Sequence, residues 1–202
     1  MYDTRPDRVA DRAKAAAWAT DVLSDERTVI LDSETTGLTD AYAVELSVTD
    51  RAGTELFDHR LNPRVAISSG ASQIHGITND DVAQAATFAD VKEELTACLK
   101  GRRVIIYNAQ YDLGILRNEL HRYYTTTKPD HVGNGEHPYV NQWRNEVSAE
   151  FECAMQRYAA WVGDWSSWHG SYTWPALEGG DHSALGDCRA VVATLQKMAA
   201  SA

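Results

Sequence analysis

The sequence has few cysteines and no long apolar run. Its three cysteines, Cys98, Cys153 and Cys188, lie far apart and form no Cys-x-x-Cys pair. A zinc cluster or a disulfide framework is therefore not expected, and we predict three reduced thiols. No apolar run approaches the roughly 18 residues of a membrane helix, and no signal-peptide core follows the charged N-terminus. We expect a cytoplasmic protein without a membrane partner.

Basic residues are also scarce. The chain of 202 residues carries 19 Lys and Arg against 29 Asp and Glu, so its formal net charge is −10. This balance argues against a protein that coats nucleic acid with a basic surface. It still allows an enzyme that holds a few nucleotides at a strand end, because bound divalent cations would supply positive charge at the phosphate.

Hydrophobic residues make up 44% of the chain, which is enough for one domain with a sizeable core. Residues 5–26 are rich in alanine and charged residues, which favours a helix. Four apolar residues are predicted to share one face of it: Ala10, Ala13, Ala17 and Val22. We predict an N-terminal helical extension over residues 1–27 and one domain over residues 28–202.

Short apolar or alternating runs predict four strands, at residues 28–31, 42–49, 54–61 and 104–107. Gly53 suits a hairpin turn between the second and third of these strands. Helical spacing is present at residues 89–99 and from about residue 111 to residue 124. A strand meander followed by crossover connections implies a mixed sheet with helices on its faces.

The C-terminal part of the chain combines a polar stretch, two helical patterns and a tryptophan-rich segment. A polar stretch is predicted to be an inserted loop over about residues 125–150. Helical spacing returns at residues 152–162, and residues 183–198 are predicted to form the final helix. Residues 161–174 hold four of the six tryptophans. These could stack on nucleic-acid bases, but we favour packing as a small helical cap, since aromatic residues dominate core burial.

Two carboxylates stand at the end of the first predicted strand. Asp32 and Glu34 are two residues apart, so their side chains share one face of that strand. Carboxylates in such a place are costly unless they are paired or bind a metal ion, and hard divalent cations prefer oxygen ligands. The alternative is a pair of solvated carboxylates, which this short pattern alone favours.

Three further residues complete a possible acidic site. Asp112 lies at the junction between a strand and a helix, where it could instead be a helix N-cap. His182 and Asp187 would point about 140° apart on one helix, so they could share a ligand only if His182 lies in the loop before it. Gly179 and Gly180 would free that loop, with Asp181 or Ser183 as the helix N-cap. Alone, His182 reads as a surface histidine beside a helix start.

Together these motifs resemble the DEDDh family of 3′–5′ exonucleases, which includes RNase T, oligoribonuclease and a proofreading polymerase subunit. The resemblance rests on residues 32–38, 108–112 and 182–187, with a secondary signature at residues 74–78. The tryptophan-rich segment is more similar to that of small stand-alone members from bacteria and phages. Nothing resembles the tail that binds a polymerase subunit, so we expect no proofreading role inside a replicase.

The resemblance implies an α/β ribonuclease H-like fold, with a central mixed five-stranded sheet flanked by helices. It implies two Mg²⁺ or Mn²⁺ ions, held by Asp32, Glu34, Asp112 and Asp187. Asp32 would bridge both ions. His182 would act as the general base.

The resemblance also implies how substrate binds. Thr35 and Leu38 would contact the terminal nucleotide, with His75 and Asn108 as further substrate-binding residues. The expected partner is the 3′ end of a nucleic acid, single-stranded and preferably DNA. Two alternatives remain: an exoribonuclease of the same family, and a catalytically silent nucleic-acid-binding module. The second is disfavoured because all five catalytic positions are filled. The sequence does not predict an oligomeric state.

Overall fold

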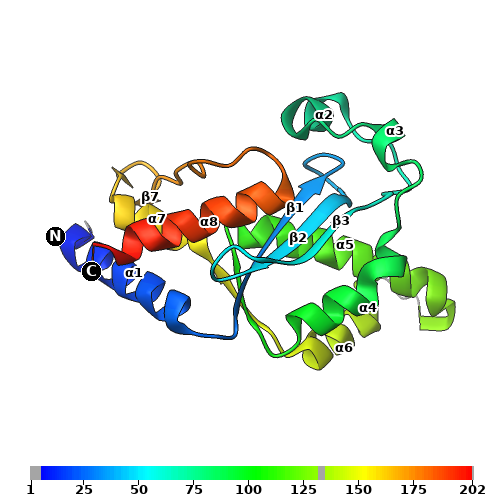
Figure 1. Ribbon diagram of the computed structural model, residues 1–202, viewed down its shortest axis with the longest axis horizontal. Helices are drawn as coiled ribbons and strands as arrows, with labels where there is room; N and C mark the ends of the chain where they lie inside the picture. Colours follow the sequence, from blue (N-terminus) through cyan, green and yellow to red (C-terminus); the bar gives the residue numbers. More distant parts are fainter. Residues whose placement is uncertain (1–5, 132–134, 202) are drawn as a thin grey trace.

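The computed structural model of the chain describes residues 6–131 and 135–201 (Figure 1). Residues 1–5 of the predicted N-terminal extension, residues 132–134 of the predicted loop and residue 202 lie outside the described residues. Within the described part, no helix is long and apolar enough to cross a membrane. The three cysteines are free thiols, as predicted, although only Cys188 is fully buried.

A mixed five-stranded sheet forms the centre of the fold, as predicted. Its strands are β1 (Thr28–Thr35), β2 (Ala43–Asp50), β3 (Glu55–Arg60), β4 (Arg103–Ile106) and β5 (Glu150–Cys153). They lie in the order β3-β2-β1-β4-β5. The β1–β2 and β2–β3 pairs are antiparallel, whereas β1–β4 and β4–β5 are parallel. β1 is therefore the central strand, and its C-terminal end lies between the two halves of the sheet.

The predicted hairpin joins β2 to β3. Gly53 has a φ of +83°, and its N–H donates to the carbonyl of Asp50 at 3.0 Å. The Asp50 carboxylate also accepts the N–H groups of Ala52 and Thr54. A positive φ is readily adopted by glycine, which explains why this residue marks the turn.

Helices cover both faces of the sheet (Figure 1). The main helices are α1 (Arg8–Ser24), α4 (Phe88–Leu99), α5 (Ala109–Thr127), α6 (Pro138–Val147), α7 (Ala154–Val162) and α8 (Ala184–Ala199). α4, α5 and α6 pack on one face, against Val29 and Leu31 of β1. α1, α7 and α8 pack on the other face, against Ile30. This alternation follows from the two-residue period of a strand.

Two short helices lie above the end of β1, α2 (Ser69–His75) and α3 (Asn79–Val82) (Figure 1). α2 ends at Gly76, which has a φ of +75°. Thr78 is the N-cap of α3, and its hydroxyl and backbone N–H form a capping box with Asp81. This region carries the secondary sequence signature.

The predicted face of α1 is wrong except for Val22. The buried residues are Ala15, Ala16, Ala19 and Val22, which join a core cluster with residues of α7 and α8. Ala13 and Ala17 are exposed. Alanines occur on several faces of this helix, so spacing alone could not select the packed one. The proposed boundary at residue 27 stays a prediction, although α1 packs on the sheet.

The predicted loop at residues 125–150 contains a helix, α6. It buries Val140, Trp143 and Val147, a spacing of three and four residues that is typical of a packed helix. The polar residues around these positions concealed that pattern. The helix expected to begin at residue 152 begins at Ala154 instead, because residues 150–153 form the edge strand β5.

The tryptophan-rich segment is not a helical cap. The side chain of Trp161, in α7, belongs to the core. The chain after α7 forms a hairpin of β6 (Trp165–Ser166) and β7 (Ser171–Tyr172). Trp165 packs edge-to-face against Tyr172. Trp168 is 88% exposed and Trp174 is 61% exposed. The expectation of packing therefore holds for only part of the segment.

Candidate functional site

A cleft of about 220 Å³ lies where β1 ends, beside the first turns of α5 and α8. Its lining residues are Asp32, Ser33, Glu34, Tyr107, Asn108, Tyr111, Asp112, Leu177, His182 and Asp187. All four predicted carboxylates and the predicted histidine are in this set. Of the four predicted substrate-binding residues, Asn108 is in it.

Asp32 and Glu34 lie on the β1 face that α8 covers, because they alternate in the same phase as Ile30. Burial raises the pKa of Asp32 well above its usual value, and the carboxylates of Asp112 and Asp187 raise it further. Burial likewise raises the pKa of Glu34 to about 8, with a further contribution from Asp187. Both groups therefore resist ionisation unless a cation approaches.

Asp112 reaches the cleft from the opposite face of the sheet. It lies in the first turn of α5, whose N-cap position is held by Asn108, so Asp112 is not the cap. It is buried, and Ser33 Oγ donates a hydrogen bond to its Oδ1 at 2.7 Å. Burial raises the pKa of Asp112 to about 7, and the hydrogen bond from Ser33 opposes this shift. β1 thus supplies carboxylates on one face and a hydroxyl on the other.

Asp187 lies in the first turn of α8 and is held by the preceding loop. Its Oδ1 accepts the backbone N–H of Asp181 at 3.0 Å and that of His182 at 3.3 Å. Burial raises its pKa, while these two hydrogen bonds oppose the rise. A Cβ atom on Gly180 would lie 2.6 Å from the same oxygen. Gly180 is therefore needed for close approach of the loop to the carboxylate.

His182 lies in the loop before α8, as predicted, and is exposed. Its φ of +59° is in the left-handed region, which is uncommon for residues other than glycine. Ser183 is the helix N-cap, and its Oγ accepts the N–H of Gly186. Ligand atoms of Glu34, His182 and Asp187 lie within 4.8 Å of one another. That spacing suits a cation held by all three.

The donor set of the cleft fits a hard divalent cation. Four carboxylates converge, and the described residues that line the cleft include no Lys, Arg or Cys. Burial and the repulsion between the carboxylates raise the pKa of Asp32 and of Glu34, and a bound cation would lower both pKa values. Carboxylate oxygens are the ligands that Mg²⁺ and Mn²⁺ prefer, whereas structural zinc sites favour cysteine and histidine.

Thr35, Leu38 and His75 form a second group next to the cleft, at the end of β1. The Nδ1 atom of His75 accepts the N–H of Ile77 at 3.0 Å, so Nε2 carries the proton. Nε2 then donates to the carbonyl of Thr35 at 3.1 Å. Leu38 is 89% exposed. The exposed apolar side chain of Leu38 therefore lies on a turn that the hydrogen bond from His75 stabilises.

Two residues of this region were not found from the sequence. The Tyr111 hydroxyl lies 2.6 Å from both Thr35 Oγ1 and the Gly37 carbonyl, so it fixes the turn before Leu38. Glu45 is buried opposite Glu34 in the β1–β2 pair. Its Oε2 accepts the N–H of Ala184 at 2.8 Å, which attaches the start of α8 to β2. Only the strand register could have indicated Glu45.

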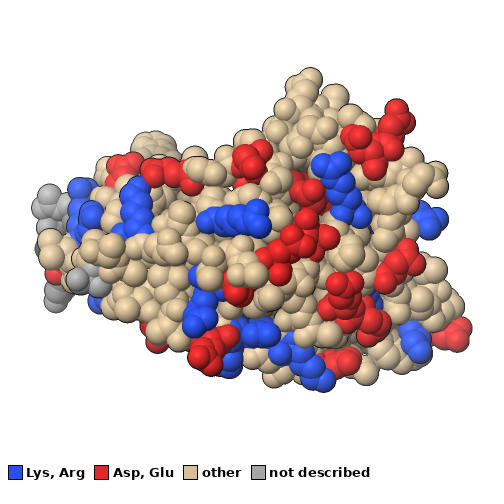
Figure 2. Space-filling view, viewed as in Figure 1, with Lys and Arg blue, Asp and Glu red and all other residues tan. Residues whose placement is uncertain are grey.

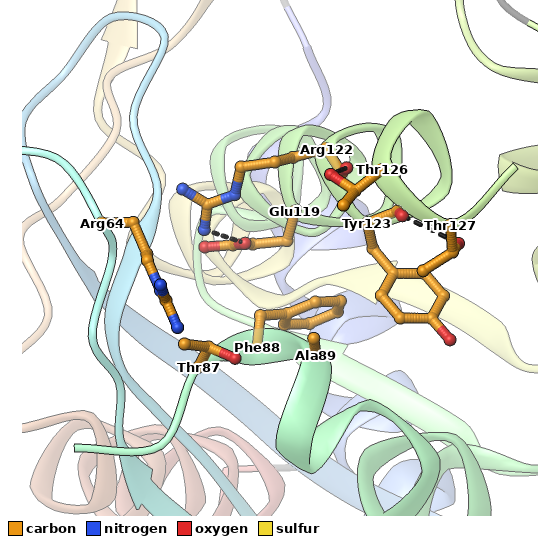
Figure 3. A pocket seen from close by; sticks show the side chains of 9 residues that line it. All are labelled: Arg64, Thr87, Phe88, Ala89, Glu119, Arg122, Tyr123, Thr126 and Thr127. Carbon is orange, nitrogen blue, oxygen red and sulfur yellow. Dashed lines mark hydrogen bonds and ion pairs between the residues drawn. The ribbon is translucent and has the colours of Figure 1, made fainter. Parts of the chain in front are cut away.

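Another hollow, of about 370 Å³, lies between α4 and α5 (Figure 3). Arg122 forms an ion pair with Glu119 there at 2.6 Å and donates to the carbonyl of Pro63. None of the predicted site residues lines this hollow. Figure 2 shows acidic and basic side chains interspersed on the visible face rather than one continuous basic surface. Charge therefore does not indicate a second nucleic-acid site on this face.

Known proteins resemble this chain over most of its length. The exonuclease family RNase T matches residues 29–195. The uncharacterized exonuclease CP81 of Escherichia phage 186 is 33% identical, covering 95% of this chain and 94% of that protein. DNA polymerase III subunit epsilon of Escherichia coli is 28% identical, covering 46% of this chain and 43% of that subunit. The chain thus spans less than half of the polymerase subunit.

Solved structures agree with the fold. Exonuclease X in complex with 5′ overhanging duplex DNA has a TM-score of 0.54 and 25% identity, covering 87% of this chain and 92% of that one. Product-bound exonuclease I has a TM-score of 0.61, covering 86% of this chain and 43% of that one, but its 16% identity supports the fold alone. The family match and the phage relative of nearly equal extent show that the chain belongs to the DnaQ-like family of 3′–5′ exonucleases.

Proposed function

We propose that this enzyme removes nucleoside 5′-monophosphates from the 3′ end of single-stranded DNA, with two divalent metal ions as cofactors. The observation that carries the proposal is the convergence of four carboxylates and one histidine on a single cleft at the end of β1. Buried carboxylates that lie close together destabilise the folded protein unless a positive charge compensates them. Cation binding accounts for it.

Asp32, Glu34 and Asp187 would hold one Mg²⁺ or Mn²⁺ ion, and Asp32 would bridge to a second ion near Asp112. When bound, such a pair supplies positive charge at the attacking and leaving oxygens of an in-line displacement. The protein residues set the geometry. The Ser33 hydroxyl orients Asp112, and two backbone N–H groups orient Asp187. These contacts favour the ionised carboxylates that a cation requires.

His182 would take the proton from the attacking water. An imidazole suits this role because its ordinary pKa lies near neutrality. The exposed position of His182, next to Glu34 and Asp187, supports the assignment. The same spacing would also allow His182 to be a metal ligand, so the two roles have to be separated by experiment.

The terminal nucleotide would lie between the cleft and the turn after β1. Leu38 is exposed there and would contact the terminal base, while Thr35 and Asn108 would bind its sugar and phosphate. His75 would act through the Thr35 carbonyl that it binds. The DNA preference is supported by exonuclease X, which was solved in complex with 5′ overhanging duplex DNA.

The test uses strands labelled at the 5′ end: single-stranded DNA, duplex DNA and RNA, each with Mg²⁺ and with Mn²⁺. The proposal predicts a descending ladder from single-stranded DNA and slower reaction when a phosphate blocks the 3′-OH. Immediate release of the labelled 5′ nucleotide, or cleavage of circular strands, would contradict the proposed polarity. A faster reaction on RNA would assign the enzyme to the exoribonucleases of the family instead.

A further inference from the structure

Two tryptophans after α7 are exposed although their neighbours are packed. Trp168 lies in the turn of the β6–β7 hairpin, and Trp174 lies two residues after β7; they are 88% and 61% exposed. Tryptophan carries a large apolar area and is normally covered for that reason. Two such side chains in one short segment mark this surface as a binding surface.

The support beneath these tryptophans is fixed. Trp165 packs edge-to-face against Tyr172, with ring centroids 5.3 Å apart. The Tyr172 hydroxyl donates to Asp11 of α1 at 2.9 Å, and the N–H of Thr173 donates to the carbonyl of Asp164. The hairpin is therefore bonded to α1, and the residues that flank its two strands are hydrogen-bonded to each other. Its exposed rings are held on a structured element.

The segment continues into the wall of the cleft. The Tyr107 hydroxyl donates to the carbonyl of Pro175 at 2.8 Å, and both Tyr107 and Leu177 line the cleft. Trp174 directly precedes Pro175. Leu177 is three residues after Trp174, so the backbones of these two residues are at most about 11 Å apart. Figure 1 shows the chain running alongside α8 from β7 to the first turn of α8. The segment that carries the tryptophans thus leads into the wall of the cleft.

The segment itself offers no basic side chain for phosphate binding. The sequence has no Lys or Arg between Arg157 and Arg189, whereas Asp164 and Glu178 lie within that stretch. Aromatic rings can instead stack on bases, and they do so with little regard to sequence. Such contacts leave the phosphates pointing to solvent, away from the acidic side chains.

We propose that Trp168 and Trp174 form a stacking platform for unpaired bases of the substrate strand, on the 5′ side of the nucleotide held in the cleft. The inference rests on the proposed exonuclease function and adds a reason for a single-strand preference. Bases of a duplex already stack on one another, so they are not free to stack on a protein surface. The platform accepts any base sequence.

The binding test measures anisotropy of a 5′-labelled oligothymidylate, with chelator present to prevent hydrolysis. Trp168→Ala and Trp174→Ala should each weaken binding by about 10-fold, the expected scale for one stacked base. Trp168→Phe and Trp174→Phe should retain most of the affinity because they keep an aromatic ring. Leu56→Ala, at an exposed apolar residue of β3, is the matched control and should change nothing.

Two further readouts separate stacking from other roles. With metal present, the alanine variants should raise KM for the long strand at unchanged kcat, and should leave hydrolysis of a thymidine dinucleotide unaffected. The slope of log affinity against log salt should not change, because no ion pair is removed. Alanine variants that bind the long strand like wild type would overturn the platform, as would equal losses on the dinucleotide. Failure of the proposed function would look different, since wild type would then hydrolyse neither strand.

Discussion

Ser33 and Asp112 join the two faces of the sheet at the end of β1, through a hydrogen bond of 2.7 Å between Ser33 Oγ and Asp112 Oδ1. Ser33 alternates with Asp32 and Glu34 along the strand, so it points away from them and toward α5. One strand thus presents two carboxylates to the cleft and orients a third that comes from a helix. This link explains how Asp112 stays positioned although burial favours its neutral form.

Removal of this hydroxyl should weaken metal binding. Ser33→Ala would leave Asp112 without the bond that favours its ionised form, and hydrogen bonds to charged groups contribute about 1.5–3 kcal/mol. We expect roughly a 10-fold loss of Mn²⁺ affinity, measured by calorimetry. Ser33→Thr keeps a hydroxyl and should lose less. Equal affinities for wild type and Ser33→Ala would show that Asp112 takes no part in holding a cation.

Gly180→Ala should impair catalysis more than folding. The added Cβ would lie 2.6 Å from Asp187 Oδ1, so the loop or the carboxylate must move. A shift of about 1 Å in a catalytic group can reduce the rate about 10²-fold. Gly114→Ala in α5 is the matched control, because its added Cβ would meet no atom within 4 Å apart from the adjacent backbone of its own helix. Single-turnover rates should fall for Gly180→Ala and stay unchanged for Gly114→Ala.

Much of the fold was predictable because its signals are local. Apolar runs marked β1 and β4, and Gly53 marked the hairpin between β2 and β3. The helix α6 was missed because its three buried residues are dispersed among polar ones. The hairpin β6–β7 was missed because its strands have only two residues each, too few for a periodic pattern.

The site was predictable from its motifs, but its supporting contacts were not. Asp32, Glu34, Asp112, His182 and Asp187 line one cleft, as the family resemblance implied. The roles of Tyr111 and Glu45 depend on contacts between residues far apart in the sequence. Glu45 meets Ala184, 139 residues away, and no local pattern reports such a pair. The roles of Tyr111 and Glu45 are therefore visible only in the three-dimensional structure.

Without metal, the protein should lose stability as the pH rises from about 4 to about 8. Glu34 and Asp112 have folded-state pKa values of about 8 and about 7, above their unfolded values. Across this window the folded protein therefore binds more protons than the unfolded chain, and its free energy of unfolding falls with rising pH. Tm in chelator should be lower at pH 8 than at pH 5. Glu34→Gln should flatten this dependence, and a profile identical to wild type would contradict the raised pKa.

His182→Ala should lower the single-turnover rate by about 10²–10⁴-fold, the usual range for a positioned acid–base group. Metal affinity should change little, because the four carboxylates remain. Calorimetric Mn²⁺ titration of the same variant separates the two roles. A rate that falls in proportion to lost metal binding would make His182 a ligand, and an unchanged rate would exclude it from both roles.

The carboxylates of the cleft are proposed to act by holding divalent metal ions. The most direct measurement is hydrolysis of a 5′-labelled single strand by metal-stripped enzyme as Mg²⁺ or Mn²⁺ is added, for wild type and for Asp32→Ala. We predict no hydrolysis in chelator, full recovery of wild type with metal, and a rate at least about 10³-fold lower for Asp32→Ala, or about 4 kcal/mol. Full activity of wild type in chelator, or near wild-type turnover of folded Asp32→Ala, would contradict the account.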